Sequence, residues 1–264
     1  MALTTPSTLQ RREYKYLIDE DTVDQIRRYI AGICTVDPYA ERTGGRYLTD
    51  TLYLDTPQLH CYWATVDDAG DRYKLRMRGY PSLGEGPVFF EVKRRISESV
   101  RKTRGWFNGP WQQVLLDGTP ELLATIDPRQ RPAIDNFICH YHRSPMLPRC
   151  LVRYEREPYM SLIDEYARVT FDRHVTYQAA SELSLIGDTD HWTPIDDAAS
   201  QRGMAPSSSS VLLELKFTSV VPSWMRSMIQ TLGVQRLAFC KYTRAVDSMR
   251  FVPGRRIPRA GMFG

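Results

Sequence analysis

Apolar and charged residues alternate along much of this chain, which is the pattern of β-strands with two different faces. In a strand, residues two apart share a face, so each such stretch presents one apolar face and one charged face. The pattern predicts eight strands, at residues 12–17, 49–55, 72–78, 88–94, 99–104, 151–156, 167–172 and 211–217.

Helical periodicity is confined to fewer segments. Residues 21–33 carry apolar side chains on one face, with Asp21 or Thr22 as the N-cap. Residues 223–232 form a second amphipathic stretch that ends at Gly233, because glycine readily adopts the left-handed conformation of a C-cap. Shorter helical pieces are expected at residues 111–116, 121–126 and 133–141, broken by Pro120, Pro128 and Pro132.

Eight strands with sparse helices predict an α+β fold that is mainly β. The expected architecture is an eight-stranded antiparallel closed tunnel barrel with peripheral helices. The length of 264 residues fits a single domain that spans residues 1–264. A Gly/Ser/Pro-bearing stretch at 201–210 is expected to be a loop, and residues 253–264 a basic tail.

Composition excludes several classes of protein. The 35 basic and 31 acidic residues give a net charge of only +4, which is too mild to imply a nucleic-acid partner. No apolar run approaches the roughly 18 residues of a membrane span, and the N-terminus shows no signal peptide. The five cysteines are scattered without a C-x-x-C pair, which indicates reduced thiols and a cytoplasmic location.

The charged faces of the predicted strands are unusual in composition. They hold Arg and Lys with single carboxylates, in place of the mixed polar residues of a solvated face. One such strand alone is more typical of an exposed ion pair, so the repetition on successive strands is what matters. The sets at spacing two are Glu13 and Lys15; Lys74, Arg76 and Arg78; Glu91, Lys93 and Arg95; Lys102 and Arg104; Arg168 with Thr170 and Asp172; and Glu214 and Lys216.

These charges predict an anion-binding cavity. The alternate faces are apolar, as in Leu213, Leu215 and Phe217, and we expect helices to cover them. The charged faces then point inward, where crowded like charges are costly without an anion of high charge density. A chain of phosphates, held by Arg and Lys, is the obvious candidate. The carboxylates on these faces, which include Glu13, Glu91 and Glu214, would hold a divalent cation on those phosphates.

Nine short motifs resemble, in order, those of the VTC (vacuolar transporter chaperone) catalytic domain. This domain is the polyphosphate polymerase branch of the triphosphate tunnel metalloenzymes, in the CYTH-like superfamily. The motifs cover about residues 10 to 250. They are REYKY (12–16), TLYLDTP (51–57), KLRMR (74–78), FEVKR (90–94), VRKTR (100–104), VRYER (152–156), ARVTFD (167–172), LELKF (213–217) and FCKY (239–242).

The resemblance implies a tunnel that transfers the γ-phosphate of ATP to polyphosphate with Mn²⁺ or Mg²⁺, in the cytoplasm of a bacterium-like cell. It makes Glu214 the metal-binding carboxylate and Lys241 a basic residue near the tunnel end. By position, the residues that match the phosphate-gripping side chains are Lys15, Arg76, Arg78, Lys93, Lys102, Arg156 and Arg168. Among these, we expect Arg76, Arg78, Lys93, Arg156 and Arg168 to hold the triphosphate for transfer, with Lys74, Arg104 and Lys216 as further substrate contacts.

Two positions depart from the family pattern, and other functions stay open. Cys240 stands where the family has serine, and Ala238 where it has lysine. If water is the acceptor, the same site is an inorganic triphosphatase or a nucleoside triphosphatase. A non-catalytic polyphosphate-binding module is a third hypothesis. Glu214 argues against it, because a site that only binds anions gains nothing from a carboxylate among its cations. An RNA-binding protein lacks support, because the sequence shows no aromatic platform interleaved with basic residues.

Overall fold

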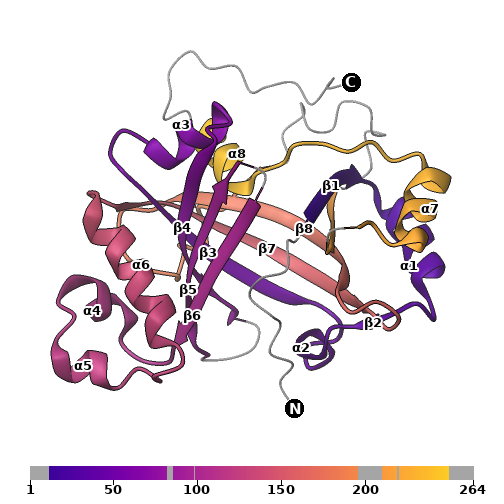
Figure 1. Cartoon of the computed structure of the whole chain (residues 1–264). Helices are drawn as coiled ribbons and strands as arrows, with labels where there is room; N and C mark the ends of the chain where they lie inside the picture. The colour runs from indigo at the N-terminus through magenta and orange to yellow at the C-terminus, as the bar shows by residue number, and fades with distance from the viewer. Residues whose placement is uncertain (1–11, 82–85, 98, 196–209, 219, 250–264) are drawn as a thin grey trace.

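The computed structural model describes residues 12–81, 86–97, 99–195, 210–218 and 220–249 (Figure 1). The predicted loop at 201–210 lies outside these residues except for Ser210, which is buried. The predicted basic tail at 253–264 lies wholly outside them. In the described segments, no helix is long and apolar enough to cross a membrane.

All eight predicted strands are present, and β7 extends well beyond its predicted range at both ends. A β-bulge between Arg153 and Glu155 interrupts the period of two within the predicted range of β7. Two short strands, β2 (Cys34–Val36) and β9 (Thr193–Pro194), pair with β7 and β8. The eight main strands are β1 (Arg12–Ile18), β3 (Tyr47–Asp55), β4 (Asp71–Gly79), β5 (Val88–Ile96), β6 (Ser99–Phe107), β7 (Leu147–Ser161), β8 (Ala167–Ala179) and β10 (Val211–Phe217).

The strands form one antiparallel sheet in the order β1-β10-β8-β7-β3-β4-β5-β6. Within the described residues β1 and β6 do not pair with each other, so the predicted closure into a barrel is not confirmed. Alternation assigns the faces of a strand, but closure depends on tilt and stagger, which the pattern does not carry. The free edge of β1 is partly covered by the segment after α7, where the Leu237 N–H donates to the Lys15 carbonyl at 2.9 Å.

The sheet nevertheless curls strongly, as Figure 1 shows. Glu13 on β1 comes within 3.4 Å of Lys93 on β5, although five strands separate β1 from β5 in the sheet order. We call the face that carries Glu13 and Lys93 the inner face. It is the charged face that the sequence predicted to point inward.

The helices are α1 (Glu20–Ile30), α2 (Pro38–Glu41), α3 (His60–Val66), α4 (Trp111–Leu116), α5 (Pro120–Ala124), α6 (Arg131–Arg143), α7 (Ser223–Leu232) and α8 (Lys241–Ser248). The N-cap of α1 is Asp19, which accepts from the Thr22 N–H at 2.8 Å, and not Asp21 or Thr22. Pro132 lies in the first turn of α6, where proline starts a helix and does not break it. The sequence analysis missed α2, α3 and α8, which are too short to show a period.

Helices cover the outer face of the sheet in two groups. Phe90 of β5 meets Phe137 of α6 edge-on at 5.2 Å, within the core formed with α4 to α6. Leu213 of β10 lies in a second core with Ile26 of α1 and Met228 of α7. At Gly105 of β6 a Cβ would lie 2.9 Å from an Ile134 side-chain carbon, so glycine allows α6 to approach the sheet. These contacts confirm that the apolar faces of the strands point outward under helices.

Helix α8 differs from the others because it contacts the inner face. Tyr242 stacks on Tyr53 of β3 with ring centroids 5.0 Å apart, and its hydroxyl donates to Asp55 at 2.5 Å. The same Asp55 carboxylate accepts from the backbone N–H groups of Cys61 and Tyr62 at 2.8 and 2.9 Å. Helix α8 is therefore anchored to β3 and α3, and it covers the inner face at the Asp55 end of β3.

Candidate functional site

One buried carboxylate on the inner face is surrounded by four cations. The Glu91 side chain, with 0% exposure, lies 2.6 Å from Arg76, 3.8 Å from Arg78, 2.6 Å from Lys102 and 3.1 Å from Arg104. These residues project from β4, β5 and β6, where Arg76 and Arg104 are the cross-strand partners of Glu91. We call these five residues the Glu91 cluster. It holds an excess of three positive charges.

Electrostatics in the Glu91 cluster strongly favour an anion. Burial alone would raise the pKa of Glu91, but Arg76 and Arg78, followed by Lys102 and Arg104, hold it well below its usual range. Burial and the neighbouring arginines lower the pKa of Lys102 well below its usual range, although Glu91 opposes this. The Glu91 carboxylate is thus fully ionised, while the protonated form of Lys102 beside it is disfavoured. An added anion would relieve that repulsion.

A second carboxylate, Glu214 of β10, is surrounded in the same way near the other end of the sheet order. It lies 2.8 Å from Lys216 and 3.6 Å from Lys15 on the adjacent strand β1. Arg156 of β7 and Lys241 of α8 each approach it to 3.0 Å. Burial would raise the pKa of Glu214, but these four cations hold it well below its usual range. We call these five residues the Glu214 cluster.

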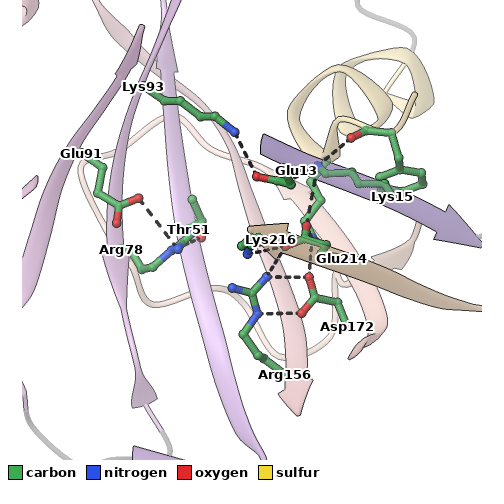
Figure 2. Close-up of polar contacts among 12 residues, drawn as sticks. Glu13, Lys15, Thr51, Arg78, Glu91, Lys93, Arg156, Asp172, Glu214 and Lys216 are labelled. Atoms are coloured by element: carbon green, nitrogen blue, oxygen red, sulfur yellow. Dashed lines mark hydrogen bonds and ion pairs between the residues drawn. The ribbon is translucent and has the colours of Figure 1, made fainter. Parts of the chain in front are cut away.

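Two further carboxylates extend this network. The Asp172 carboxylate of β8 accepts hydrogen bonds from Nε and Nη2 of Arg156, both at 2.7 Å, and from the Lys241 ammonium at 2.5 Å. Glu13 lies 3.0 Å from Lys15 and 3.4 Å from Lys93, so it joins the Glu214 cluster to β5 across the opening of the curled sheet (Figure 2). The inner face therefore carries a continuous charged lining from β1 to β6.

The sum of these charges is positive. The two clusters, Glu13, Asp172, Lys93 and Lys74 together hold ten cations against four carboxylates, an excess of six. The cations are not spread over the outside, where water would screen them, but face one another across a curved sheet. Such a lining is suited to a compact, highly charged anion with several oxygens, such as a chain of phosphates.

The sequence of this chain matches the model of a known family. The model of the VTC domain family matches residues 10–250. The chain belongs to the VTC domain family. A search of curated proteins finds no sequence match.

Solved structures give weaker likenesses. The Hippeastrum protein HpAC1, described as having a dominant triphosphatase activity, is 15% identical with a TM-score of 0.49, over 93% of this chain and 98% of that one. The PH1819 protein of Pyrococcus horikoshii OT3 is 12% identical with a TM-score of 0.45, over 91% of this chain and 99% of that one. At these TM-scores, neither likeness bears on the activity of this VTC domain.

The structure brings together most of the residues that the sequence pointed to. One group surrounds Glu91, a second surrounds Glu214, and Lys93 pairs with Glu13 between them. Lys74 lies opposite Lys93 in the β4–β5 register, on the same inner face. The predicted residues found in this lining are Lys15, Lys74, Arg76, Arg78, Lys93, Lys102, Arg104, Arg156, Lys216 and Lys241 with Glu13, Glu91 and Glu214.

Arg168 is the predicted residue that the structure places apart from both clusters. It pairs in register with Lys216, but its guanidinium lies 3.6 Å from Asp37 and 5.6 Å from the centre of the Tyr166 ring. Its side chain is 41% exposed, whereas that of Arg156 is 13% exposed. Arg168 therefore belongs to the rim of the inner face and touches neither Glu91 nor Glu214.

The three carboxylates predicted as metal ligands do not converge. Glu91 has its own four cations on β4 to β6, while Glu13 and Glu214 share Lys15. In the described part of the chain, no group of three His, Cys, Asp or Glu side chains is arranged to hold a metal. Glu13 and Glu214 nevertheless fit a Mg²⁺ or Mn²⁺ ion that arrives with phosphates. Such an ion typically uses one or two carboxylates plus phosphate oxygens.

Asp172, Thr51 and Tyr53 contribute to the lining but were not among the site residues predicted from the sequence. Asp172 shares a strand face with Arg168, but only the β7–β8 register, in which Arg156 and Asp172 are partners, shows that it binds the Arg156 guanidinium. Thr51 accepts from Arg78 at 3.2 Å, and Tyr53 accepts from Arg76 at 3.3 Å. A signal for Thr51 and Tyr53 existed, because both lie at spacing two within the TLYLDTP motif.

Cys240 is the N-cap residue of α8 and lies close enough to Lys15 and Lys74 to feel their charge. Burial would raise the pKa of its thiol, but Lys74, a hydrogen bond from the Thr243 backbone and Lys15 together lower it to about 7. At neutral pH a substantial fraction is therefore thiolate. This negative charge offsets part of the cationic charge of Lys15 and Lys74.

Proposed function

We propose that this VTC domain transfers the terminal phosphoryl group of ATP to inorganic polyphosphate. An oxygen of the terminal phosphate of the polyphosphate chain forms the new P–O bond to the γ-phosphorus. The bond between that phosphorus and the β,γ-bridging oxygen breaks, and ADP leaves. Such a reaction asks the protein mainly for alignment and charge neutralisation, which a fixed array of cations supplies.

The observation that carries the proposal is the excess of cations on the inner face of the curled sheet. In the Glu91 cluster, Arg76 and Arg78 are held in place by Glu91 and by the hydroxyls of Tyr53 and Thr51. Their guanidinium groups need little reorganisation when phosphate oxygens arrive, which is the condition for electrostatic catalysis. We assign Arg76, Arg78, Lys93 and Arg156 to the reacting phosphates and Arg168 at the rim to an outer phosphate of the chain.

The metal in this proposal is Mg²⁺ or Mn²⁺, held by Glu214 and Glu13 together with phosphate oxygens. When bound, it would neutralise charge on the phosphates and polarise the reacting phosphoryl group. The protein's part is to keep both carboxylates ionised. Burial would raise the pKa of Glu13, but Lys15 and Lys93 hold it well below its usual range, as the four cations do for Glu214.

A metal-dependent triphosphatase is the second candidate, and the position of α8 favours it. Because Tyr242 of α8 packs on Tyr53 and donates to Asp55, the inner face at the Asp55 end of β3 is filled by buried side chains. An acceptor chain that entered at that end would have to displace these side chains. A short substrate with water as the acceptor fits this shape without a second chain entering opposite the first.

The setting that we expect for either reaction is a reducing cytoplasm. All five cysteines are free thiols, including the buried Cys61 and Cys150. A polyphosphate substrate and a partly ionised Cys240 thiol are both compatible with such a compartment.

The products distinguish these activities. Purified protein is incubated with ATP and Mn²⁺ or Mg²⁺, and the products are separated on a polyacrylamide gel and assayed for free phosphate. A ladder of polyphosphate supports the polymerase, free phosphate alone supports the hydrolase, and unchanged ATP contradicts both.

The metal role is tested with Glu214→Gln, which keeps the shape of the side chain but removes its charge. We expect metal-dependent turnover to fall by orders of magnitude, while tripolyphosphate binding in the presence of a chelator persists or tightens. The matched control is Glu155→Gln on β7, whose side chain is 28% exposed and lies 3.9 Å from Arg46. Near-normal turnover in Glu214→Gln would remove this residue from the metal site.

A further inference from the structure

A row of aromatic side chains borders the Glu91 cluster at the end of the inner face opposite α8. Phe89 lies two residues before Glu91 on β5, and Trp106 lies two residues after Arg104 on β6. Phe89 and Trp106 are cross-strand partners, so their side chains share the inner face with the cluster. Tyr80 follows Arg78 at the same spacing. We call Tyr47, Tyr80, Phe89 and Trp106 the aromatic row.

Three rings of this row contact one another in sequence, and Trp106 adjoins them as the cross-strand partner of Phe89. Tyr47 and Tyr80 meet edge to face with centroids 5.5 Å apart, and Tyr80 meets Phe89 in the same way at 5.5 Å. The row thus runs from β3 across β4 and β5 to β6. It was not foreseen from the sequence, which placed apolar and basic residues on opposite strand faces.

Arg104 connects the aromatic row to the Glu91 cluster. Its guanidinium lies 3.7 Å above the centre of the Phe89 ring, donates to the Tyr80 hydroxyl at 3.0 Å and lies 3.1 Å from Glu91. The aromatic and cationic parts therefore form one continuous surface. Adjacent residues on a strand face are roughly 7 Å apart, so a ligand with a charged end and a flat apolar end could span both parts.

The rings are also accessible. Trp106 is 38% exposed, and the other three rings of the row are partly exposed, unlike the outer-face Phe90, which is 0% exposed. No ring of the described residues stacks on the Trp106 indole. A large indole left open beside a cationic site is unexplained by packing alone. It offers a π-face of the kind that stacks on nucleobases.

We propose that the aromatic row binds the base of a nucleoside triphosphate whose phosphates occupy the Glu91 cluster. The inference rests on the proposed function, because it requires a triphosphate on that cluster. It adds the place of the nucleobase, which the phosphate-binding residues alone do not assign. It also sets the orientation, with the nucleoside at the open end and the γ-phosphate directed inward, toward Glu214 and α8.

The test compares two ligands that differ in the nucleoside alone. Isothermal titration calorimetry measures binding of ATP and of tripolyphosphate, without metal, to the wild type, Trp106→Ala and Trp106→Phe. We expect Trp106→Ala to weaken ATP binding roughly tenfold or more while tripolyphosphate binding stays unchanged. Trp106→Phe, which retains a π-face, should recover most of the ATP affinity.

Trp63→Ala on α3 is the matched control, because Trp63 is also 38% exposed but lies beyond the opposite end of β3. It should leave both affinities unchanged. The melting temperature of each variant verifies that it is folded. Trp106 fluorescence, as the difference between wild type and Trp106→Phe, should respond to ATP and not to tripolyphosphate.

Two results would overturn the inference, and they differ in scope. If the wild type binds tripolyphosphate but Trp106→Ala loses no more affinity for ATP than for tripolyphosphate, the base does not lie on the aromatic row. In that case the proposed phosphoryl transfer still stands. If the wild type binds neither ligand, the proposed function and this inference fall together.

Discussion

Replacing Glu91 by glutamine tests how much of the charged lining depends on one carboxylate. The substitution keeps the size of the side chain but leaves Arg76, Arg78, Lys102 and Arg104 without the negative charge that lies 2.6 to 3.8 Å from them. Removing one partner of a buried ion pair typically costs about 3–5 kcal/mol. For a chain of this size, that corresponds to a fall in melting temperature of roughly 6–20 °C.

The same variant should bind phosphates more tightly, because the four cations lose their internal competitor. Saturating tripolyphosphate is therefore expected to restore most of the lost melting temperature. Differential scanning fluorimetry of the wild type, Glu91→Gln and the outer-face control Glu155→Gln, each with and without tripolyphosphate, measures both effects. The control should change little, since exposed ion pairs contribute about 0–1 kcal/mol.

The pH dependence follows from the lowered pKa of Glu91. A carboxylate whose pKa is lowered by folding stabilises the protein above its unfolded pKa, about 4.3, and loses that contribution as the pH falls through the folded value. The difference in melting temperature between the wild type and Glu91→Gln should therefore be constant from neutral pH down to about 5 and shrink only in stronger acid. A variant that melts like the wild type and binds tripolyphosphate no more tightly would refute the assignment of Glu91 as the common counter-ion.

Three further outcomes are expected. Lys102→Met should leave the melting temperature of the free protein unchanged or raised, because burial and the neighbouring arginines disfavour the lysine's charge, but it should reduce the shift caused by tripolyphosphate. The rate of alkylation of Cys240 by iodoacetamide, measured by mass spectrometry with the exposed Cys139 as an internal reference, should rise with pH through about 7. The rate should fall when tripolyphosphate binds to Lys15 and Lys74. An unchanged rate with tripolyphosphate would place the anion elsewhere. Tyr242→Phe should lower the free energy of unfolding, measured by chemical denaturation, by about 1–3 kcal/mol, because Asp55 loses a buried hydrogen-bond donor. A loss of less than a few tenths of a kcal/mol would show that this hydrogen bond does not anchor α8.

Much of the fold could be predicted from alternation, because the period of two is a direct consequence of strand geometry. Leu75 and Met77 point outward and Arg76 and Arg78 inward, as the sequence indicated. Closure of the barrel could not be predicted, since it depends on whether β1 and β6 meet. Helix α8 was also missed, because a helix of eight residues shows barely two turns of any period.

The candidate site was predicted in composition but not in arrangement. Spacing within a strand identified the charged residues, yet it could not show that Glu91 and Glu214 organise two separate groups, which depends on the register between strands. For the same reason Glu214 was expected to share a metal with Glu13 or Glu91, and Arg168 was expected to hold the triphosphate together with Arg156. The aromatic row was missed because Phe89 and Trp106 adjoin apolar neighbours, so their outward or inward direction is ambiguous in sequence.

The most direct test of the central claim, that the inner face is a binding site for a chain of phosphates, is the melting temperature of the wild type with tripolyphosphate or sulfate at matched ionic strength. A ligand at a hundredfold excess over its Kd stabilises the native state by about 2.7 kcal/mol. That corresponds to a rise of roughly 5–11 °C for a chain of this size. We predict such a rise with tripolyphosphate and a much smaller one with sulfate, which cannot reach cations on several strands at once. Equal shifts with the two anions would contradict the account.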